Sequence, residues 1–140
     1  MAVAEIKRFF NKYRFAAYHT LFQRLKEREG SLSATETFAV DVIYLLGRPT
    51  IKQFSDSLGI SQPNATYKVA SLMKKGYVQK ETSKDDKREF FLVLTDKFYQ
   101  YHQELDTYAN EVEYYLNKVL TEEEKKVFEK ALKKLNDAIM

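Results

Sequence analysis

Residues 50–95 read TIKQFSDSLGISQPNATYKVASLMKKGYVQKETSKDDKREFFLVLT, and the expected fold class rests on this segment. It opens with Ile51, Phe54 and Leu58, whose spacing predicts a short helix with one buried face. Gly59 follows directly. Glycine tolerates the left-handed conformation that often ends a helix, so the first helix is predicted to stop there.

A second helix is predicted to begin at Ser61, which is a good N-cap residue. Pro63 fits the first turn, because that turn makes no use of the N–H group that proline lacks. The residues of its buried stripe recur at helical spacing and are Ala65, Val69 and Leu72. Two helices joined by a tight turn are therefore expected.

The opposite face of this second helix carries mostly small and polar side chains, which let a helix approach base edges closely. Asn64 has the paired donor and acceptor that suit adenine, and Tyr67 can contact a phosphate or a thymine methyl group. The alternative is a solvated helix in an ordinary bundle. The candidate DNA-binding residues of this helix are Ser61, Gln62, Pro63, Asn64, Thr66, Tyr67, Lys68 and Ser71.

Two runs of β-forming residues, 77–82 and 90–95, predict a hairpin with a charged tip. Lys84, Lys87 and Arg88 at the tip can follow phosphates, and an arginine on a ribbon can enter the minor groove. Asp86 is interpreted as a brace that holds Arg88 through a charge-assisted hydrogen bond. An exposed hairpin with solvated charges is the alternative. Helix, turn, helix and hairpin in this order predict a winged helix-turn-helix that reads DNA.

Residues 61–78, followed by Asp86-Lys87-Arg88 and then Leu94-Thr95, resemble the MarR family of transcriptional regulators. The order of a long N-terminal helix, a winged lobe and two C-terminal helices extends the resemblance over nearly the whole chain. It implies that the helix over 61–75 enters the major groove and that Arg88 reaches the minor groove. The sequence departs from the family at Tyr67, where many members carry an arginine, so that arginine's base contact is not carried over.

The flanks of the winged lobe predict long helices with apolar faces. The C-terminal long helix has a seam that begins at Phe98 and Tyr101, and Thr121 with Glu124 forms a capping box before the last helix. These helices could cover one another within one chain. A symmetric homodimer is favoured, because the compact lobe cannot cover three long helical faces and paired readers match palindromic DNA; the family resemblance implies it as well. The predicted dimerisation residues are Ile6, Phe9, Phe10, Tyr13, Tyr115, Val119, Phe128, Leu132, Leu135 and Ile139.

The chain is accordingly expected to be mainly α with a small β-hairpin wing, as a single domain over residues 1–140. Residues 33–95 form the predicted DNA-binding lobe, and residues 1–30 and 97–140 form the helical dimerisation region. The expected function is sequence-specific binding to double-stranded DNA. Repression is favoured over activation, because binding near a promoter blocks polymerase.

Composition fits a small intracellular regulator. A net charge of +3 and a pI near 8.9 are only mildly basic, so affinity for DNA must come from the placement of charge. The absence of cysteine excludes disulfides and thiolate metal sites. Charged residues interrupt the first 17 positions, so neither a signal peptide nor a membrane span is expected, and the protein is predicted to be cytoplasmic.

No enzymatic site is expected. His19 and His102 are the only histidines, and neither has a second ligand or a nucleophile at a recognisable spacing, so no metal and no cofactor are predicted. A small apolar or phenolic effector is a further candidate partner, although aromatic residues are more often core or dimer interface. The residues that could line its pocket are Tyr13, Tyr18, Phe22, Phe38 and Tyr44.

Two alternatives remain open. One is a helical protein-interaction or ligand-binding module whose winged helix docks a protein, which would lack salt-dependent, sequence-selective binding to duplex DNA. The other is a metal-sensing or redox-sensing regulator, against which the missing cysteines and sparse histidines count.

Overall fold

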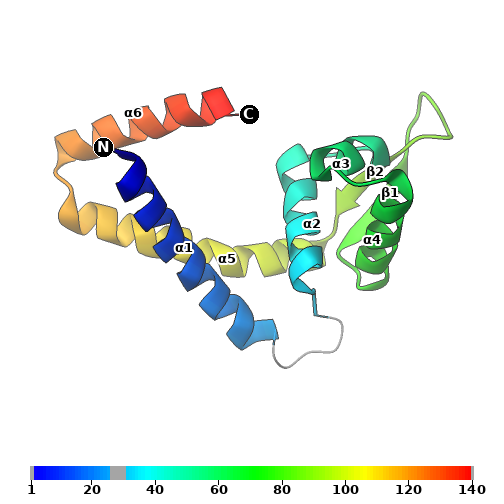
Figure 1. Cartoon of the computed structure of the whole chain (residues 1–140), viewed down its shortest axis with the longest axis horizontal. Helices are drawn as coiled ribbons and strands as arrows, with labels where there is room; N and C mark the ends of the chain where they lie inside the picture. The colour runs from blue at the N-terminus through cyan, green and yellow to red at the C-terminus, as the bar shows by residue number, and fades with distance from the viewer. Residues whose placement is uncertain (1, 26–30, 140) are drawn as a thin grey trace. The chain divides into compact units, whose positions relative to one another are not determined.

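A computed structural model describes residues 2–25 and 31–139. The elements run in the order α1 (Ala2–Leu25), α2 (Ala34–Leu46), α3 (Ile51–Leu58), α4 (Gln62–Lys74), β1 (Val78–Thr82), β2 (Phe90–Leu94), α5 (Asp96–Val119) and α6 (Glu122–Ile139) (Figure 1). The strands form one antiparallel hairpin, so the predicted fold class, mainly α with a β-hairpin wing, is confirmed. None of the described helices combines the length and the apolar character that crossing a membrane requires.

The chain divides into two compact units. The lobe comprises Tyr18–Glu104 and so contains the end of α1, all of α2 to β2 and the beginning of α5. The helical unit comprises the chain up to Ala17 together with the residues from Leu105 onward. Each unit is described by itself below.

The lobe is built around a core to which every one of its helices from α2 to α5 contributes. Helix α3 packs between α2 and α4, and β2 lies against α2 and α3. The hairpin is tied to the connection before α3, because the N–H of Leu92 donates to the carbonyl of Pro49 at 2.8 Å. The side chains with no exposed surface are Val40, Ile43, Phe54, Ala65, Leu72, Leu92 and Phe98.

Helix ends in the lobe follow the capping signals of the sequence. Gly59 adopts the left-handed conformation (φ 64°) and its N–H bonds the last turn of α3, as predicted. The hydroxyl of Ser61 accepts from the N–H of Asn64 at 3.3 Å and so caps α4, also as predicted. A capping box of Ser33 and Glu36 at the start of α2 was not among the predicted features.

The apolar seam of α5 does not behave as one continuous surface. Phe98 is fully buried and Tyr101 is 8% exposed, because both pack inside the lobe, where the Phe98 ring lies 5.7 Å from that of Tyr44. In the helical unit, Tyr115 and Val119 are 59% and 68% exposed. The beginning of the seam therefore completes the core of the lobe, whereas Tyr115 and Val119 stay exposed.

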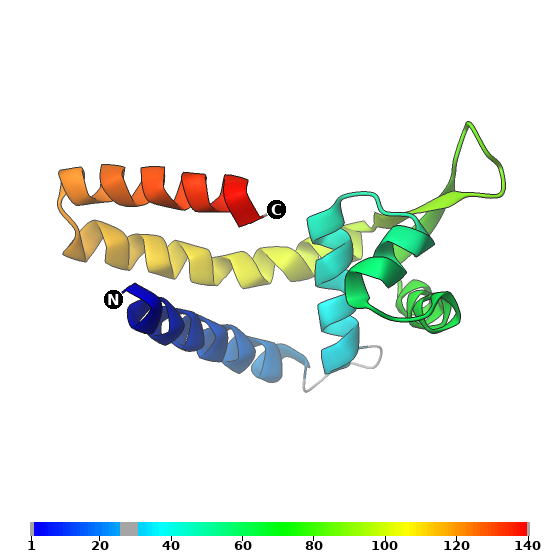
Figure 2. The ribbon, with the colours of Figure 1, turned by 45° about the horizontal axis from the view of Figure 1, so that its top comes forward.

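The helical unit leaves apolar side chains uncovered. Helix α6 turns back after α5 (Figure 2) and starts at the predicted capping box, in which the carboxylate of Glu124 accepts from the N–H of Thr121 at 3.0 Å. Helix α6 contains no buried residue among those described. Exposed apolar side chains of the helical unit include Ile6, Phe9, Phe10, Tyr13, Phe128, Leu132, Leu135 and Ile139.

Candidate nucleic-acid interface

The outer face of α4 carries the side chains that the sequence marks for DNA contact. Tyr67 is 77% exposed, and Asn64 lies one turn before it on the same exposed side. Ala65 and Val69 are buried on the opposite side, which fixes the direction in which the outer face points. The other exposed candidates of this face are Ser61, Gln62, Pro63 and Thr66, and Lys68 is half-buried.

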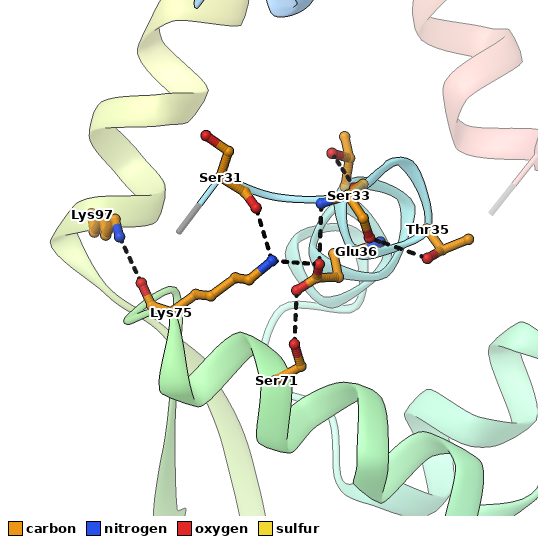
Figure 3. Close-up of polar contacts among 8 residues, drawn as sticks. Ser31, Ser33, Thr35, Glu36, Ser71, Lys75 and Lys97 are labelled. Carbon is orange, nitrogen blue, oxygen red and sulfur yellow. Dashed lines mark hydrogen bonds and ion pairs between the residues drawn. The ribbon is translucent and has the colours of Figure 1, made fainter. Parts of the chain in front are cut away.

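Ser71 departs from the predicted interface. Its hydroxyl donates to Oε2 of Glu36, on α2, at 3.0 Å, and the residue is half-buried (Figure 3). A hydroxyl that is bonded toward the lobe is poorly placed to meet a base edge. We therefore leave Ser71 out of the interface and return to it as part of the support for α4.

The hairpin loop projects beyond the two strands as a wing (Figures 1 and 2). Ser83, only 7% exposed, organises its tip: the N–H groups of Asp85 and Asp86 donate to the Ser83 hydroxyl at 3.3 and 3.4 Å. The N–H of Ser83 in turn donates to the carbonyl of Glu89 at 2.9 Å. Sequence reasoning missed Ser83, although a serine two residues before a turn that contains aspartates is a known turn-forming signal.

Asp86 and Arg88 are in the contact that the sequence predicts. Oδ1 of Asp86 accepts from the backbone N–H of Arg88 at 2.9 Å and from its Nε at 3.3 Å. These hydrogen bonds hold the pKa of the Asp86 carboxyl below its ordinary value. The Arg88 side chain is 92% exposed, so most of its guanidinium is open to solvent although its Nε bonds the carboxylate, and Lys84 and Lys87 of the same tip are exposed as well.

Two cations not singled out from the sequence support the base of the wing. Arg48 pairs with Glu81 of β1 at 2.7 Å, and its guanidinium lies 5.0 Å from the centre of the Phe91 ring. Lys80 lies 4.3 Å above the Phe90 ring. Cation–π contacts between residues far apart in the sequence cannot be found from periodicity alone.

A polar network joins the end of α4 to the beginning of α2 (Figure 3). Nζ of Lys75 donates to Oε1 of Glu36 at 2.7 Å and to the carbonyl of Ser31 at 2.8 Å. Glu36 also accepts from Ser71 and from the N–H of Ser33. Burial by itself raises the pKa of Glu36, but the hydrogen bonds from Lys75, Ser33 and Ser71 outweigh it and lower the pKa to about 2.

This network predicts an acid-dependent loss of stability. Because the pKa of Glu36 is lower in the folded chain than its ordinary value of 4.5, its contribution to stability is present above about pH 4.5 and disappears as the pH falls toward 2. We expect on the order of 1–2 kcal/mol, less than the full linkage value because water still reaches the pair. Thermal unfolding followed by circular dichroism across this range should show a shallower acid slope for Glu36→Gln. Glu129→Gln, at an exposed position on α6, is the control, and equal slopes in parent and Glu36→Gln would contradict the assignment.

The aromatic residues suggested for an effector pocket are distributed over both units. Tyr13 belongs to the helical unit, and the other four lie in the lobe. Phe22 and Phe38 are 71% and 53% exposed, and Tyr18 and Tyr44 are about two-fifths exposed, so none of the four belongs to the buried core. The ring of Tyr44 also lies 4.3 Å from that of His102. Their role in binding a ligand stays a prediction.

Within the part of the chain that the structure describes, no three histidine, cysteine or acidic side chains are grouped as a metal site would require. The exposed groups that α4 and the wing do present are hydrogen-bonding, cationic and aromatic side chains.

The lobe with its exposed α4 face and its wing is similar to known proteins. Residues 32–90 match the model of the MarR family. A relative in Bacillus subtilis (strain 168), the uncharacterized HTH-type transcriptional regulator YkoM, is 28% identical over 103 residues, which cover 69% of this chain and 66% of that protein. The match thus spans just under two thirds of the relative's length.

Solved structures share the fold over nearly the full chain. A MarR-like transcriptional regulator from Thermotoga maritima is 24% identical with a TM-score of 0.62, covering 99% of this chain and 97% of that one. Streptococcus pneumoniae FabT, solved in complex with DNA, is 22% identical with a TM-score of 0.63, covering 98% and 96%. A mutant of MepR from a multidrug-resistant S. aureus clinical isolate is 15% identical with a TM-score of 0.75, covering 100% and 98%. Residues 32–90 thus match the model of the MarR family, and nearly the full chain shares the fold of solved MarR-like transcriptional regulators.

Proposed function

We propose that this protein is a homodimeric repressor that binds double-stranded DNA in a sequence-specific manner through α4 and the wing. The observation that carries the proposal is the pairing, in one lobe, of an exposed polar face on α4 with a braced arginine on the wing. The fold shared with FabT, whose structure was solved in complex with DNA, supports the same assignment.

The proposed DNA-binding residues fall into two groups, those that contact bases and those that contact phosphates. Asn64 offers the amide that pairs with adenine, and the exposed ring of Tyr67 suits a thymine methyl group or a phosphate. Gln62 and Thr66 are also exposed in the first two turns of α4. On the wing, Arg88 is proposed to enter the minor groove, and Lys84 with Lys87 to follow the phosphates.

The proposed dimer forms through the helical unit. Leu132, Leu135 and Ile139 are 42%, 50% and 74% exposed on one helix, which is a large apolar surface to leave in water. A second copy of the chain offers the same surface, and a two-fold axis makes the two faces self-complementary. Such a dimer presents two α4 helices to successive major grooves, ~34 Å apart.

Repression follows from occupation of a promoter, since a bound dimer blocks polymerase. As a DNA-binding regulator, the protein is proposed to act in the cytoplasm. A small apolar or phenolic effector could release the DNA if it binds the aromatic residues of the lobe, such as Phe22 and Phe38, more tightly in the DNA-incompetent state.

Selection of bound duplexes from a random library at near-physiological salt tests the proposal. We expect a palindrome whose half-sites are about one helical turn apart. Asn64→Ala is expected to change the selected motif more than it changes affinity for non-specific DNA, because the amide reads a base and carries no charge.

The result of the selection distinguishes a sequence-specific DNA-binding regulator from a protein-docking module. An unchanged motif for Asn64→Ala would remove this residue from base reading. A single unrepeated half-site would contradict the dimer. The absence of any enriched sequence for the parent would refute sequence-specific binding and favour a module whose winged helix docks a protein.

A further inference from the structure

The last turn of α4 is held by directional contacts that differ from the apolar packing of the rest of the helix. Ser71 and Lys75 are four residues apart and therefore lie on one side of the helix. Both bind the same carboxylate, that of Glu36, through its two different oxygens, at 3.0 and 2.7 Å (Figure 3). Lys75 also reaches the carbonyl of Ser31 at 2.8 Å, so one ammonium group joins α4 to two points at the beginning of α2.

A second attachment comes from α5. Nζ of Lys97 donates to the carbonyl of Lys75 at 2.6 Å and lies 4.6 Å above the Tyr77 ring. The hydroxyl of Thr95 donates to the carbonyl of Gly76 at 2.6 Å. A cation at a helix C-terminus is favourable because the helix dipole is negative there. The end of α4 is thus held from α2 and from α5 within the same lobe.

The other end of α4 is different. From Ser61 to Asn64 every side chain is exposed, and the N-terminal cap is a contact of the helix with itself, from Asn64 N–H to the Ser61 hydroxyl. Ala65 and Val69 press the helix against the lobe, but small apolar contacts have no direction and resist rotation about the helix axis less than hydrogen bonds do.

We propose that Glu36 and Lys75, with Ser71, are positioning residues for DNA recognition, which fix the rotation and tilt of α4 and so determine where Asn64 and Tyr67 meet the bases. This inference rests on the proposed function. None of the three positioning residues is proposed to touch DNA. They act through the backbone of α4.

A small tilt at the supported end of α4 becomes a large displacement at its other end, where Asn64 lies. Asn64 lies eleven residues before Lys75, roughly 16 Å along the axis at ~1.5 Å per residue. A tilt of about 5° at the fixed end moves the Asn64 backbone by about 1.4 Å, whereas recognition geometry tolerates roughly 0.5 Å. The side chains of Lys75 and Glu36 are only 26% and 12% exposed, so water competes for their contact less than at an exposed pair.

Lys75→Met compared with Lys74→Met tests the proposal. The two lysines are adjacent, each substitution removes one positive charge and keeps a long side chain, and Lys74 is exposed. The readout is the ratio of affinity for the selected duplex to affinity for a scrambled duplex of equal length, measured by fluorescence anisotropy at one salt concentration. Loss of a charge weakens both affinities alike and cancels in this ratio.

Lys75→Met is expected to lower the ratio by about ten-fold or more, and Lys74→Met to leave it near the parent value. Glu36→Gln keeps an oxygen for Lys75 and for the N–H of Ser33, so it should fall between the parent and Lys75→Met. Ser71→Ala removes one neutral hydrogen bond and is expected to lower the ratio roughly three-fold. It supplies the readout if Lys75→Met does not fold.

A role in stability alone would leave the ratio unchanged. Folded Lys75→Met, or folded Ser71→Ala in its place, with the parent's ratio would overturn the positioning role and leave the proposed function intact. A parent protein that selects no sequence would overturn both, so the two failures are distinguishable.

Discussion

Replacing Arg88 by alanine is expected to weaken binding to the selected duplex by roughly 2–6 kcal/mol in the proposed dimer. Each of the two wings then loses an arginine contact, worth ~1–3 kcal/mol. The arginine is 92% exposed in the free lobe but is not loosely attached, because Asp86 binds both its backbone N–H and its Nε. This contact restricts the arginine before it meets DNA, which lowers the conformational entropy lost on binding and so raises the net value of the DNA contact.

Fluorescence anisotropy with the selected duplex measures this effect, with Lys133→Ala as a control that removes a positive charge from α6. Asp86→Ala distinguishes a specific role of Asp86 in holding Arg88 from an effect of net charge alone. Removing a negative charge should strengthen DNA binding if only net charge mattered, whereas loss of the brace should weaken it. Binding by Arg88→Ala equal to that of Lys133→Ala would remove the wing from the mechanism.

Phe98→Ala is expected to lower the free energy of unfolding of the lobe by ~3–5 kcal/mol. Its ring has no exposed surface and lies 5.7 Å from the Tyr44 ring of α2 and 5.4 Å from the His102 ring. Truncation leaves a cavity at the place where α5 joins the lobe. Domains of this size have total stabilities of only ~5–15 kcal/mol, so the variant should be close to unfolding at ordinary temperature.

Urea unfolding followed by circular dichroism measures the loss. Tyr99→Ala, at the next residue along α5, is the comparison because its ring is 47% exposed, and it should cost about 1 kcal/mol. If Phe98→Ala cost no more than Tyr99→Ala, Phe98 would not be the anchor of α5 that its burial indicates.

The helix-turn-helix could be predicted from sequence because its signals are local. Gly59 and Ser61 determine their own turn through backbone conformation and capping, and the spacing of Ala65, Val69 and Leu72 determines which side of α4 is buried. The contact between Asp86 and Arg88 was also within reach, because the two residues are only two positions apart.

The parts that could not be predicted depend on residues far apart in the chain. Ser71 lies beside buried Leu72, at the edge of the exposed face, and only the presence of Glu36, 35 positions away, turns its hydroxyl inward. The seam of α5 has one period throughout, yet Phe98 lies in a core and Val119 lies in solvent. Periodicity identifies an apolar face but not what covers it.

The first turn of α4 carries residues that are proposed to contact bases, and its last turn carries the proposed positioning residues Ser71 and Lys75. Gln62 and Asn64 lie in the first turn, so substitutions there leave Ser71 and Lys75 undisturbed, and the preferred sequence can be redesigned without changing the support of the helix. Glu36 lacks this freedom, since it closes the first turn of α2 as well as holding α4. A library for altered specificity should accordingly randomise the first turn of α4 and keep Glu36, Ser71 and Lys75 constant.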